Sequence, residues 1–167
     1  AKALNPHIDF FYFDVWCSIK EVKCGIHAIK EFKKPYLVGL HISEGTTLPS
    51  GESIKEIKDI IDENALGVIL ACVSPENFEK NLYELKSLNI PFGFKLNGFV
   101  TTKLKESYTS IFIGNKSNPN EILGKREDLT PTRIKEIAKE FKDAGATIIG
   151  GCCETSPSHI EAMAKIK

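Results

Sequence analysis

The stretch Asp143-Ala-Gly-Ala-Thr-Ile-Ile-Gly-Gly-Cys-Cys-Glu-Thr-Ser-Pro-Ser-His-Ile160 joins an apolar run to two glycines, two adjacent cysteines and a helix start. Residues 146–149 form a short β-prone run, which is typical of a strand buried on both faces. The two glycines let the chain turn, so that successive thiols can face one cavity. Ser156 followed by Pro157 predicts a helix start, because Ser is a good N-cap and Pro fits the next position. The stretch therefore predicts a strand, a thiol site at its end, and a helix.

The same order of strand and helix recurs along the chain. Apolar runs predict strands at residues 10–15, 35–42, 66–72, 90–96 and 146–151. Helical periodicity predicts helices at residues 18–32, 54–61, 75–88, 132–144 and 157–166. Residues 101–130 break the pattern and predict a long polar loop around the apolar segment 111–113, of the kind that covers a site. Five strands alternating with helices predict a parallel sheet of the α/β class, and the spacings leave both an open sheet and a barrel possible.

Composition bounds the function classes. The chain has 167 residues, of which 42% are apolar and 26% charged, and we expect one domain over residues 1–167. Lys plus Arg and Asp plus Glu are equal at 22 each, so bulk charge indicates neither a nucleic-acid nor a membrane partner. No apolar stretch approaches the roughly 18 to 20 residues that span a bilayer, and residues 1–13 do not resemble a signal peptide. We therefore expect a soluble, cytoplasmic protein that acts on small molecules.

The five cysteines indicate metal binding more than disulfides. They form an odd, unevenly spaced set at Cys17, Cys24, Cys72, Cys152 and Cys153, unlike a secreted disulfide framework. Cys72 ends a predicted strand two strand–helix units before the adjacent pair, so in a barrel these thiols would lie on alternate strands and meet at the mouth. Three thiolates leave one tetrahedral position open, which is typical of a catalytic zinc. Unrelated buried cysteines and a redox pair at Cys152 and Cys153 remain the alternatives, and Cys17 and Cys24 are assigned no role.

The residues around the adjacent cysteines can be compared with known families. They comprise Gly150-Gly151-Cys152-Cys153 followed by Thr155, Pro157, His159 and Ile160. This pattern resembles the C-terminal signature of the zinc-dependent homocysteine S-methyltransferases. Residues 67–76, which include Cys72, are similar to an earlier strand of that family that carries a third zinc thiolate. Ala71 and Glu154 stand where the family usually has Asn and Gly.

The resemblance implies a fold. Members of this family are (β/α)8 TIM barrels, and the match covers nearly the whole chain but only their C-terminal part. We therefore expect a partial barrel of about five parallel strands, corresponding to the family's strands four to eight. Five strands cannot close an eight-stranded barrel, so we expect a homo-oligomer, another chain that supplies the missing wall, or a missing N-terminal segment.

The resemblance also implies an activity. We expect Zn²⁺ bound by Cys72, Cys152 and Cys153, and methyl transfer from a donor that the sequence does not identify to the thiol of homocysteine, giving methionine. Zinc favours the thiolate form of a bound thiol at neutral pH, and the thiolate is the nucleophile. The alternative is a zinc-holding module without turnover that serves binding or assembly.

Two further residues are substrate candidates by the same resemblance. Asp14 ends the first strand, where the family carries a Glu, and would hold the amino group of homocysteine. Its alternatives are capping of the helix that begins at Ser18 or pairing with a lysine. Asn97 lies where the family has Pro-Asn after its seventh strand, with a turn role as its alternative. His159 and His41 are expected to have structural partners more than catalytic ones.

Overall fold

The computed structural model describes residues 1–102 and 123–166. Within these residues the five strands are β1 (Phe11–Trp16), β2 (Tyr36–Leu40), β3 (Ala65–Val73), β4 (Phe92–Leu96) and β5 (Ile148–Gly151). The four α-helices of the same ranges are α1 (Ile19–Ile29), α2 (Pro75–Ser87), α3 (Pro131–Asp143) and α4 (Pro157–Ala164). They also contain three short 3-10 helices, η1 (Asn5–His7), η2 (Lys30–Phe32) and η3 (Ile54–Asp59). Most of the predicted polar loop, including residues 111–113, lies outside the described residues.

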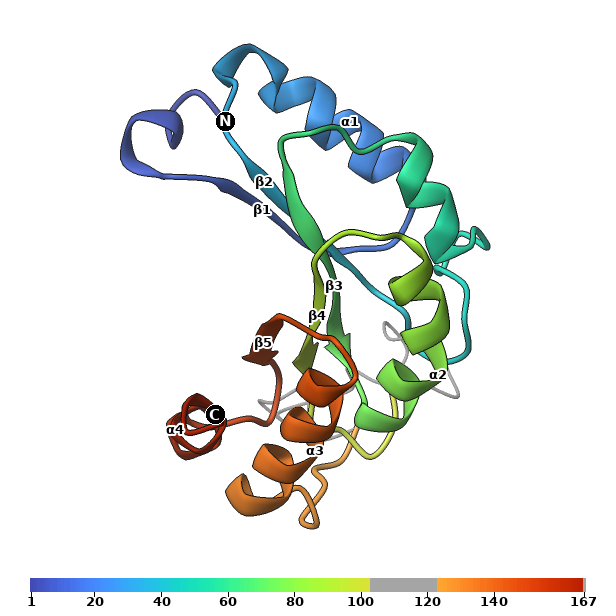
Figure 1. Cartoon of the computed structure of the whole chain (residues 1–167), viewed down its shortest axis with the longest axis vertical. Helices are drawn as coiled ribbons and strands as arrows, with labels where there is room; N and C mark the ends of the chain where they lie inside the picture. Colours follow the sequence, from blue (N-terminus) through green and yellow to red (C-terminus); the bar gives the residue numbers. More distant parts are fainter. Residues whose placement is uncertain (103–122, 167) are drawn as a thin grey trace, which may run out of the picture.

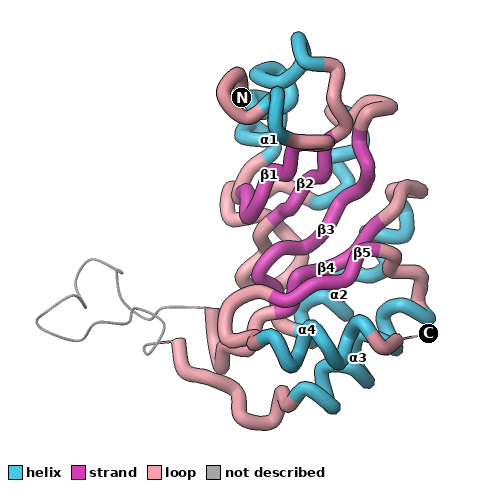
Figure 2. The backbone as a smooth tube through the Cα atoms, turned by 90° about the vertical axis from the view of Figure 1, so that its left-hand side faces the viewer, coloured by secondary structure: helices cyan, strands magenta, loops and turns pink. Residues whose placement is uncertain are grey.

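The strands form one parallel sheet in the order β1-β2-β3-β4-β5, so each strand pairs with the next one along the chain. This arrangement confirms the predicted α/β class, and it places every strand's carboxyl end at the same edge of the sheet. Figure 1 shows the sheet curving into an open arc, with α1, α2 and α3 on its convex side. Figure 2 shows the strands lying side by side in sequence order. The order and curvature are those of part of a (β/α) barrel wall.

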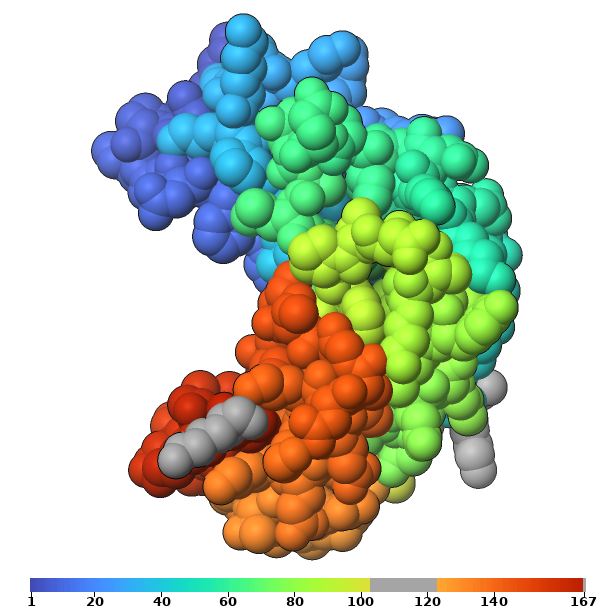
Figure 3. All heavy atoms as spheres, in the orientation of Figure 1, coloured from blue at the N-terminus to red at the C-terminus, as the bar shows by residue number. Residues whose placement is uncertain are grey.

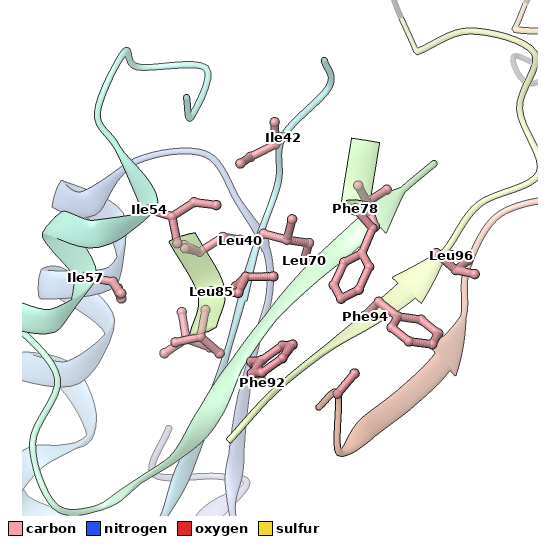
Figure 4. Packing of buried hydrophobic residues seen from close by; sticks show 14 of the residues in the cluster. Leu40, Ile42, Ile54, Ile57, Leu70, Phe78, Leu85, Phe92, Phe94 and Leu96 are labelled. Atoms are coloured by element: carbon pink, nitrogen blue, oxygen red, sulfur yellow. The ribbon is translucent and has the colours of Figure 1, made fainter. Parts of the chain in front are cut away.

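The core lies between the sheet and the helices on the convex side (Figure 4). Leu40, Leu70 and Phe94 point from successive strands into this layer, and each has no exposed surface. Phe78 of α2 and Phe141 of α3 pack against Phe94, with ring centroids 5.0 and 5.5 Å from it. These contacts fix the helices against the convex face, so the concave face of the sheet remains available for a site.

Local signals explain where the helices begin. Ser18 and Glu21 form a capping box at the start of α1, since each side chain bonds the other's backbone N–H. Helices α2, α3 and α4 each have Pro in their first turn, where its missing N–H leaves no donor unsatisfied. The helix predicted at residues 54–61 is wrong in type, because η3 is a 3-10 helix of 6 residues. Little chain separates its Ser53 cap from the turn before β3, and short connecting helices commonly take this form.

The concave side of the arc is hollow. Figure 3 shows a deep recess between the N-terminal and C-terminal parts of the chain. Its lining includes Tyr12 of β1, Leu37 of β2, Ile69 of β3, Lys95 of β4 and Ile160 of α4. The recess and the strand ends above it therefore form the accessible surface on which a site can be built.

No helix in the described residues is both long enough and apolar enough to cross a membrane.

Candidate metal centre

A β-bulge at the end of β3 presents the first thiol. Ala71 pairs with Lys95 and Val73 pairs with Leu96, so Cys72 between them has no partner in the ladder. Cys72 has φ 57, a left-handed conformation that is uncommon outside glycine. Bulges of this kind redirect a side chain and are frequent beside functional sites. The local backbone thus takes the Cys72 thiol out of the strand's alternation.

The chain leaving β5 presents the other two thiols. Cys152 N–H donates to the carbonyl of Leu96 at 2.7 Å, which extends the pairing of β5 with β4 by one residue. The Cys152 carbonyl accepts from both the backbone N–H and the hydroxyl of Thr155, at 3.1 and 2.5 Å. Glu154 has φ 61 and turns the chain toward α4. These bonds hold the two successive cysteines in a tight turn at the sheet edge.

The three thiols meet at the carboxyl ends of alternate strands. The sulfur atoms of Cys72, Cys152 and Cys153 all lie within 4.8 Å of one another, and those of Cys72 and Cys153 are 3.7 Å apart. Each residue is half-buried. A tetrahedral zinc with Zn–S bonds of about 2.3 Å would separate its sulfur ligands by about 3.8 Å. The cluster therefore has the donor type and the spacing that a thiolate-bound metal requires.

The three thiols of the cluster differ in pKa. A hydrogen bond from the Cys72 thiol, helped by the positive charge of Lys95, lowers the pKa of Cys152 to about 6 despite its burial. The same hydrogen bond, together with burial, raises the pKa of Cys72 far above its usual range. Burial and the Cys152 charge raise the pKa of Cys153. Cys152 is thus the thiol that loses its proton most readily, and metal binding must displace the protons that remain on the cluster.

Asn97 lies directly beside the cluster. It has no exposed surface, its Nδ2 donates to the Cys72 carbonyl at 2.7 Å, and its Oδ1 accepts from the N–H of Phe99 at 3.1 Å. The second of these bonds is the turn contact that the sequence left as an alternative. Both polar ends of the amide therefore have backbone partners, and its contact with the cluster runs through Cys72.

Asp14 lies on the concave face, two residues before β1 ends at Trp16, and so does not end the strand as expected. Its Oδ2 accepts from Lys95 Nζ at 2.6 Å and its Oδ1 accepts from the Tyr12 hydroxyl at 2.6 Å. Pairing with a lysine was one of the alternatives for Asp14, whereas the carboxylate that takes part in capping α1 belongs to Glu21. Lys95 and Tyr12 were not singled out from the sequence. A charged residue inside the otherwise apolar β4 was the available signal for Lys95.

The remaining candidates lie outside the thiol cluster. His159 bonds Ser156 through Nδ1 at 3.0 Å and the Leu129 carbonyl through Nε2 at 2.9 Å. His41 bonds the Ala71 carbonyl at 3.3 Å and the Ser43 hydroxyl at 2.9 Å. Both rings thus have the structural partners that we expected. Cys17 and Cys24 do not belong to the cluster.

Comparison with known proteins identifies the family. A family model described as homocysteine S-methyltransferase matches residues 1–166. Homocysteine S-methyltransferase 1 of Saccharomyces cerevisiae is 29% identical over 168 residues, covering 96% of this chain and 48% of the relative. Homocysteine S-methyltransferase 1 of Zea mays is 29% identical over 167 residues, covering 95% and 46%. The chain thus spans about half the length of these curated relatives.

Solved structures show the same fold. The apo form of the homocysteine methyltransferase MmuM from Escherichia coli matches with a TM-score of 0.71 at 15% identity, covering 98% of this chain and 52% of that one. The metallated form of MmuM matches with a TM-score of 0.70 at 16% identity, covering 97% and 46%. At such identities the likeness concerns the fold, and the family assignment comes from the sequence match. The chain belongs to the homocysteine S-methyltransferase family.

Proposed function

We propose that this chain forms the C-terminal part of a zinc-dependent enzyme that transfers a methyl group to the thiol of homocysteine, giving methionine. The observation that carries the proposal is the cluster of Cys72, Cys152 and Cys153 at the carboxyl ends of β3 and β5. Active sites of (β/α) barrels lie at this face. Family membership over residues 1–166 supports the activity, and the half-length match supports the assignment to the C-terminal part.

Zinc is the metal that best suits these ligands. Soft thiolates favour zinc over the hard cations magnesium and calcium, and three of them leave a fourth tetrahedral position for a substrate atom. Zinc held by Cys72, Cys152 and Cys153 would supply a Lewis acid that keeps a substrate thiol deprotonated at neutral pH. The 3.7 Å between two of the sulfur atoms is close to the separation of about 3.8 Å that tetrahedral zinc gives its thiolates.

The chain's own residues would orient the reactants. Asp14 is the proposed partner of the substrate ammonium, because it places a carboxylate on the concave face below the thiols. A direct contact between Asn97 and the substrate stays a prediction. Its amide already has two backbone partners, so we propose that it acts by holding Cys72. Displacement of a methyl group from a sulfonium or ammonium donor then requires alignment and exclusion of water.

Exclusion of water requires a wall that the described residues do not supply. We propose that the remaining strands come from a preceding segment of the same polypeptide, from a second copy or from another chain. The recess in Figure 3 would then become the interior of a closed barrel. We also propose a cytoplasmic location, because all five cysteines are free and a thiolate metal site needs reduced sulfur.

The test is metal analysis combined with an activity assay. Protein purified under reducing conditions should contain one zinc per chain. It should form methionine from homocysteine and either a sulfonium or a quaternary ammonium donor once a polypeptide with the first three strands is supplied. Zinc without methionine formation would favour the zinc-holding module instead. Absence of zinc from reduced protein would contradict both functions.

A further inference from the structure

An ion pair crosses the concave face of the sheet. Lys95 Nζ on β4 and Asp14 Oδ2 on β1 are 2.6 Å apart, although two strands lie between β1 and β4. Tyr12 on β1 donates to the second oxygen of Asp14, and the Lys95 ammonium lies 5.2 Å from the centre of the Tyr12 ring. The pair therefore spans the inside of the arc, with Tyr12 supporting both of its members.

Two glycines make room for this bridge. A Cβ on Gly39 of β2 would lie 2.7 Å from the Tyr12 hydroxyl oxygen, so the tyrosine occupies the space over that strand. A Cβ on Gly150 of β5 would lie 3.2 Å from Cγ of Lys95, so the lysine stem runs over that strand. The glycines of β2 and β5 thus leave the space that Tyr12 and Lys95 occupy. This distinguishes the bridge from an ion pair between two freely exposed side chains.

The bridge lies just below the thiol cluster. Lys95 pairs with Gly150, two residues before Cys152, and two residues of strand span about 6.6 Å. The side chains of Lys95 and Asp14 keep 22% and 41% of their surface exposed, so a ligand in the recess can reach both. A thiol held at the cluster would therefore extend its other end toward a positive and a negative group placed side by side.

We propose that Lys95 and Asp14 form a clamp for the amino-acid end of a zwitterionic thiol, in which Lys95 binds the α-carboxylate and Asp14 binds the α-ammonium. This assignment rests on the proposed function and adds Lys95 as a residue that determines specificity. Without ligand the two side chains neutralise each other. An α-amino acid inserts one charge of each sign between them, so that no charge loses its partner. A thiol with only one of the two groups would leave either Lys95 or Asp14 without a partner. The clamp would therefore favour an α-amino-acid thiol over such a thiol.

The test compares three thiols by titration calorimetry on zinc-loaded protein. The thiols are L-homocysteine, 3-aminopropanethiol, which lacks the carboxylate, and 4-mercaptobutanoate, which lacks the ammonium. Lys95→Met should weaken homocysteine about 10- to 100-fold and leave 3-aminopropanethiol unchanged or tighter. Asp14→Asn should weaken homocysteine and leave 4-mercaptobutanoate unchanged or tighter. Lys95→Arg keeps the charge and should restore most of the carboxylate-dependent binding.

Controls separate the clamp from a structural role. Lys139→Met removes another lysine–aspartate pair, the one with Asp143 on α3, and should change none of the three affinities. Zinc content and thermal unfolding should match between Lys95→Met and the parent. Equal weakening of all three thiols by Lys95→Met, or unchanged homocysteine binding, would overturn the clamp and leave the proposed function standing. Failure of the zinc-loaded parent to bind homocysteine, even with a polypeptide that carries the first three strands added, would overturn both.

Discussion

Asn97 Nδ2 donates a hydrogen bond of 2.7 Å to the carbonyl of Cys72, and this bond ties the end of β4 to the bulge in β3 that carries the first thiol. The next residue, Gly98, donates its N–H to the Cys153 carbonyl at 2.9 Å. One turn after β4 therefore contacts both strand ends that carry thiols. The spacing of the cluster depends on this turn, because neither strand end is joined directly to the other in the sheet.

Asn97→Ala should loosen the cluster and lower the affinity for zinc. The substitution leaves a buried carbonyl and a buried N–H without partners, which costs about 1 to 3 kcal/mol of unfolding free energy. The zinc dissociation constant should rise about 10- to 100-fold, as for other groups that orient metal ligands. Asn81→Ala is the control, because Asn81 of α2 is equally buried and its Nδ2 donates to the carbonyls of Gly45 and Asn77, away from the cluster. It should lose stability while keeping its zinc affinity, and equal zinc loss in both variants would contradict the positioning role.

Serine in place of any one of Cys72, Cys152 and Cys153 should reduce zinc well below one per chain. Serine replaces the soft thiolate with a harder hydroxyl that stays protonated, so a ligand is lost with little change of volume. Cys24→Ser is the control, because Cys24 is exposed on α1 and outside the cluster. Metal analysis of reduced protein decides the matter, and equal zinc retention in all four variants would sink the assignment.

Cys152 should be the most reactive thiol of the metal-free cluster at neutral pH. Its pKa is lowered to about 6, first by the hydrogen bond from Cys72, and the thiolate is the form that reacts with an alkylating reagent. The alkylation rate should therefore rise with pH and reach half its maximum near pH 6. Mass spectrometry of iodoacetamide-treated protein locates the modified residue.

Cys17 provides the comparison for that experiment. Burial and then the Glu21 charge raise the pKa of Cys17, so its alkylation should require alkaline solution. Added zinc should protect Cys152 and leave Cys17 unaffected. A midpoint for Cys152 near the ordinary thiol value would show that the hydrogen bond from Cys72 does not form.

The strands were predictable because a parallel sheet covered by helices needs continuous apolar runs, and such runs are plain at β2, β3 and β4. Their ends were less so. Strand β5 begins at Ile148 and not at residue 146, because Ala146 donates its N–H to the Phe141 carbonyl and still closes the end of α3. Gly145, with φ 112, allows that turn. The apolar character of Ala146 was visible in the sequence, but its hydrogen-bond partner was not.

The thiol cluster was predictable because cysteines at strand ends of one parallel sheet must share an edge. The bridge from Lys95 to Asp14 was not, because sequence periodicity does not show which side chains meet across several strands. The bulges at Val15 and Cys72 were also hidden, since neither Val, which is β-branched, nor Cys normally adopts positive φ. Both bulges lie beside residues proposed to bind metal or substrate, where such strain is commonly found.

Val15→Asn should stabilise the protein. Val15 has φ 60, a conformation that costs about 1 to 2 kcal/mol for most residues and that Asn tolerates better. Val15 is only 36% exposed, so the substitution also gives up part of its buried apolar surface, which offsets some of the relieved strain. The unfolding free energy in urea should rise by at most about 1 kcal/mol. Val100→Asn, at an exposed valine without positive φ, should stay within about 0.5 kcal/mol of the parent. A loss of stability in Val15→Asn would mean that the strain at the bulge is smaller than the burial that Val15 contributes.

The chain alone should not behave as a finished, monomeric methyltransferase. In the described residues β1 and β5 each pair with a strand on one side only, and unpaired strand edges tend to bind another chain. The recess is open along the same side, so water reaches the surroundings of the thiols and removes the dry environment that methyl transfer needs. We expect association through these edges, and little homocysteine methylation until a polypeptide with the first three strands of the barrel is added.

Light scattering and an activity assay check this expectation together. Ile160→Lys places a charge where α4 borders the recess and should weaken the association, because Ile160 is an exposed apolar residue on that side. Leu66→Lys is the matched control, since Leu66 is similarly exposed near the start of the internal strand β3 and should leave the association unchanged. A mass equal to one chain, together with homocysteine turnover of about 1 per second or more, would contradict the need for a second wall.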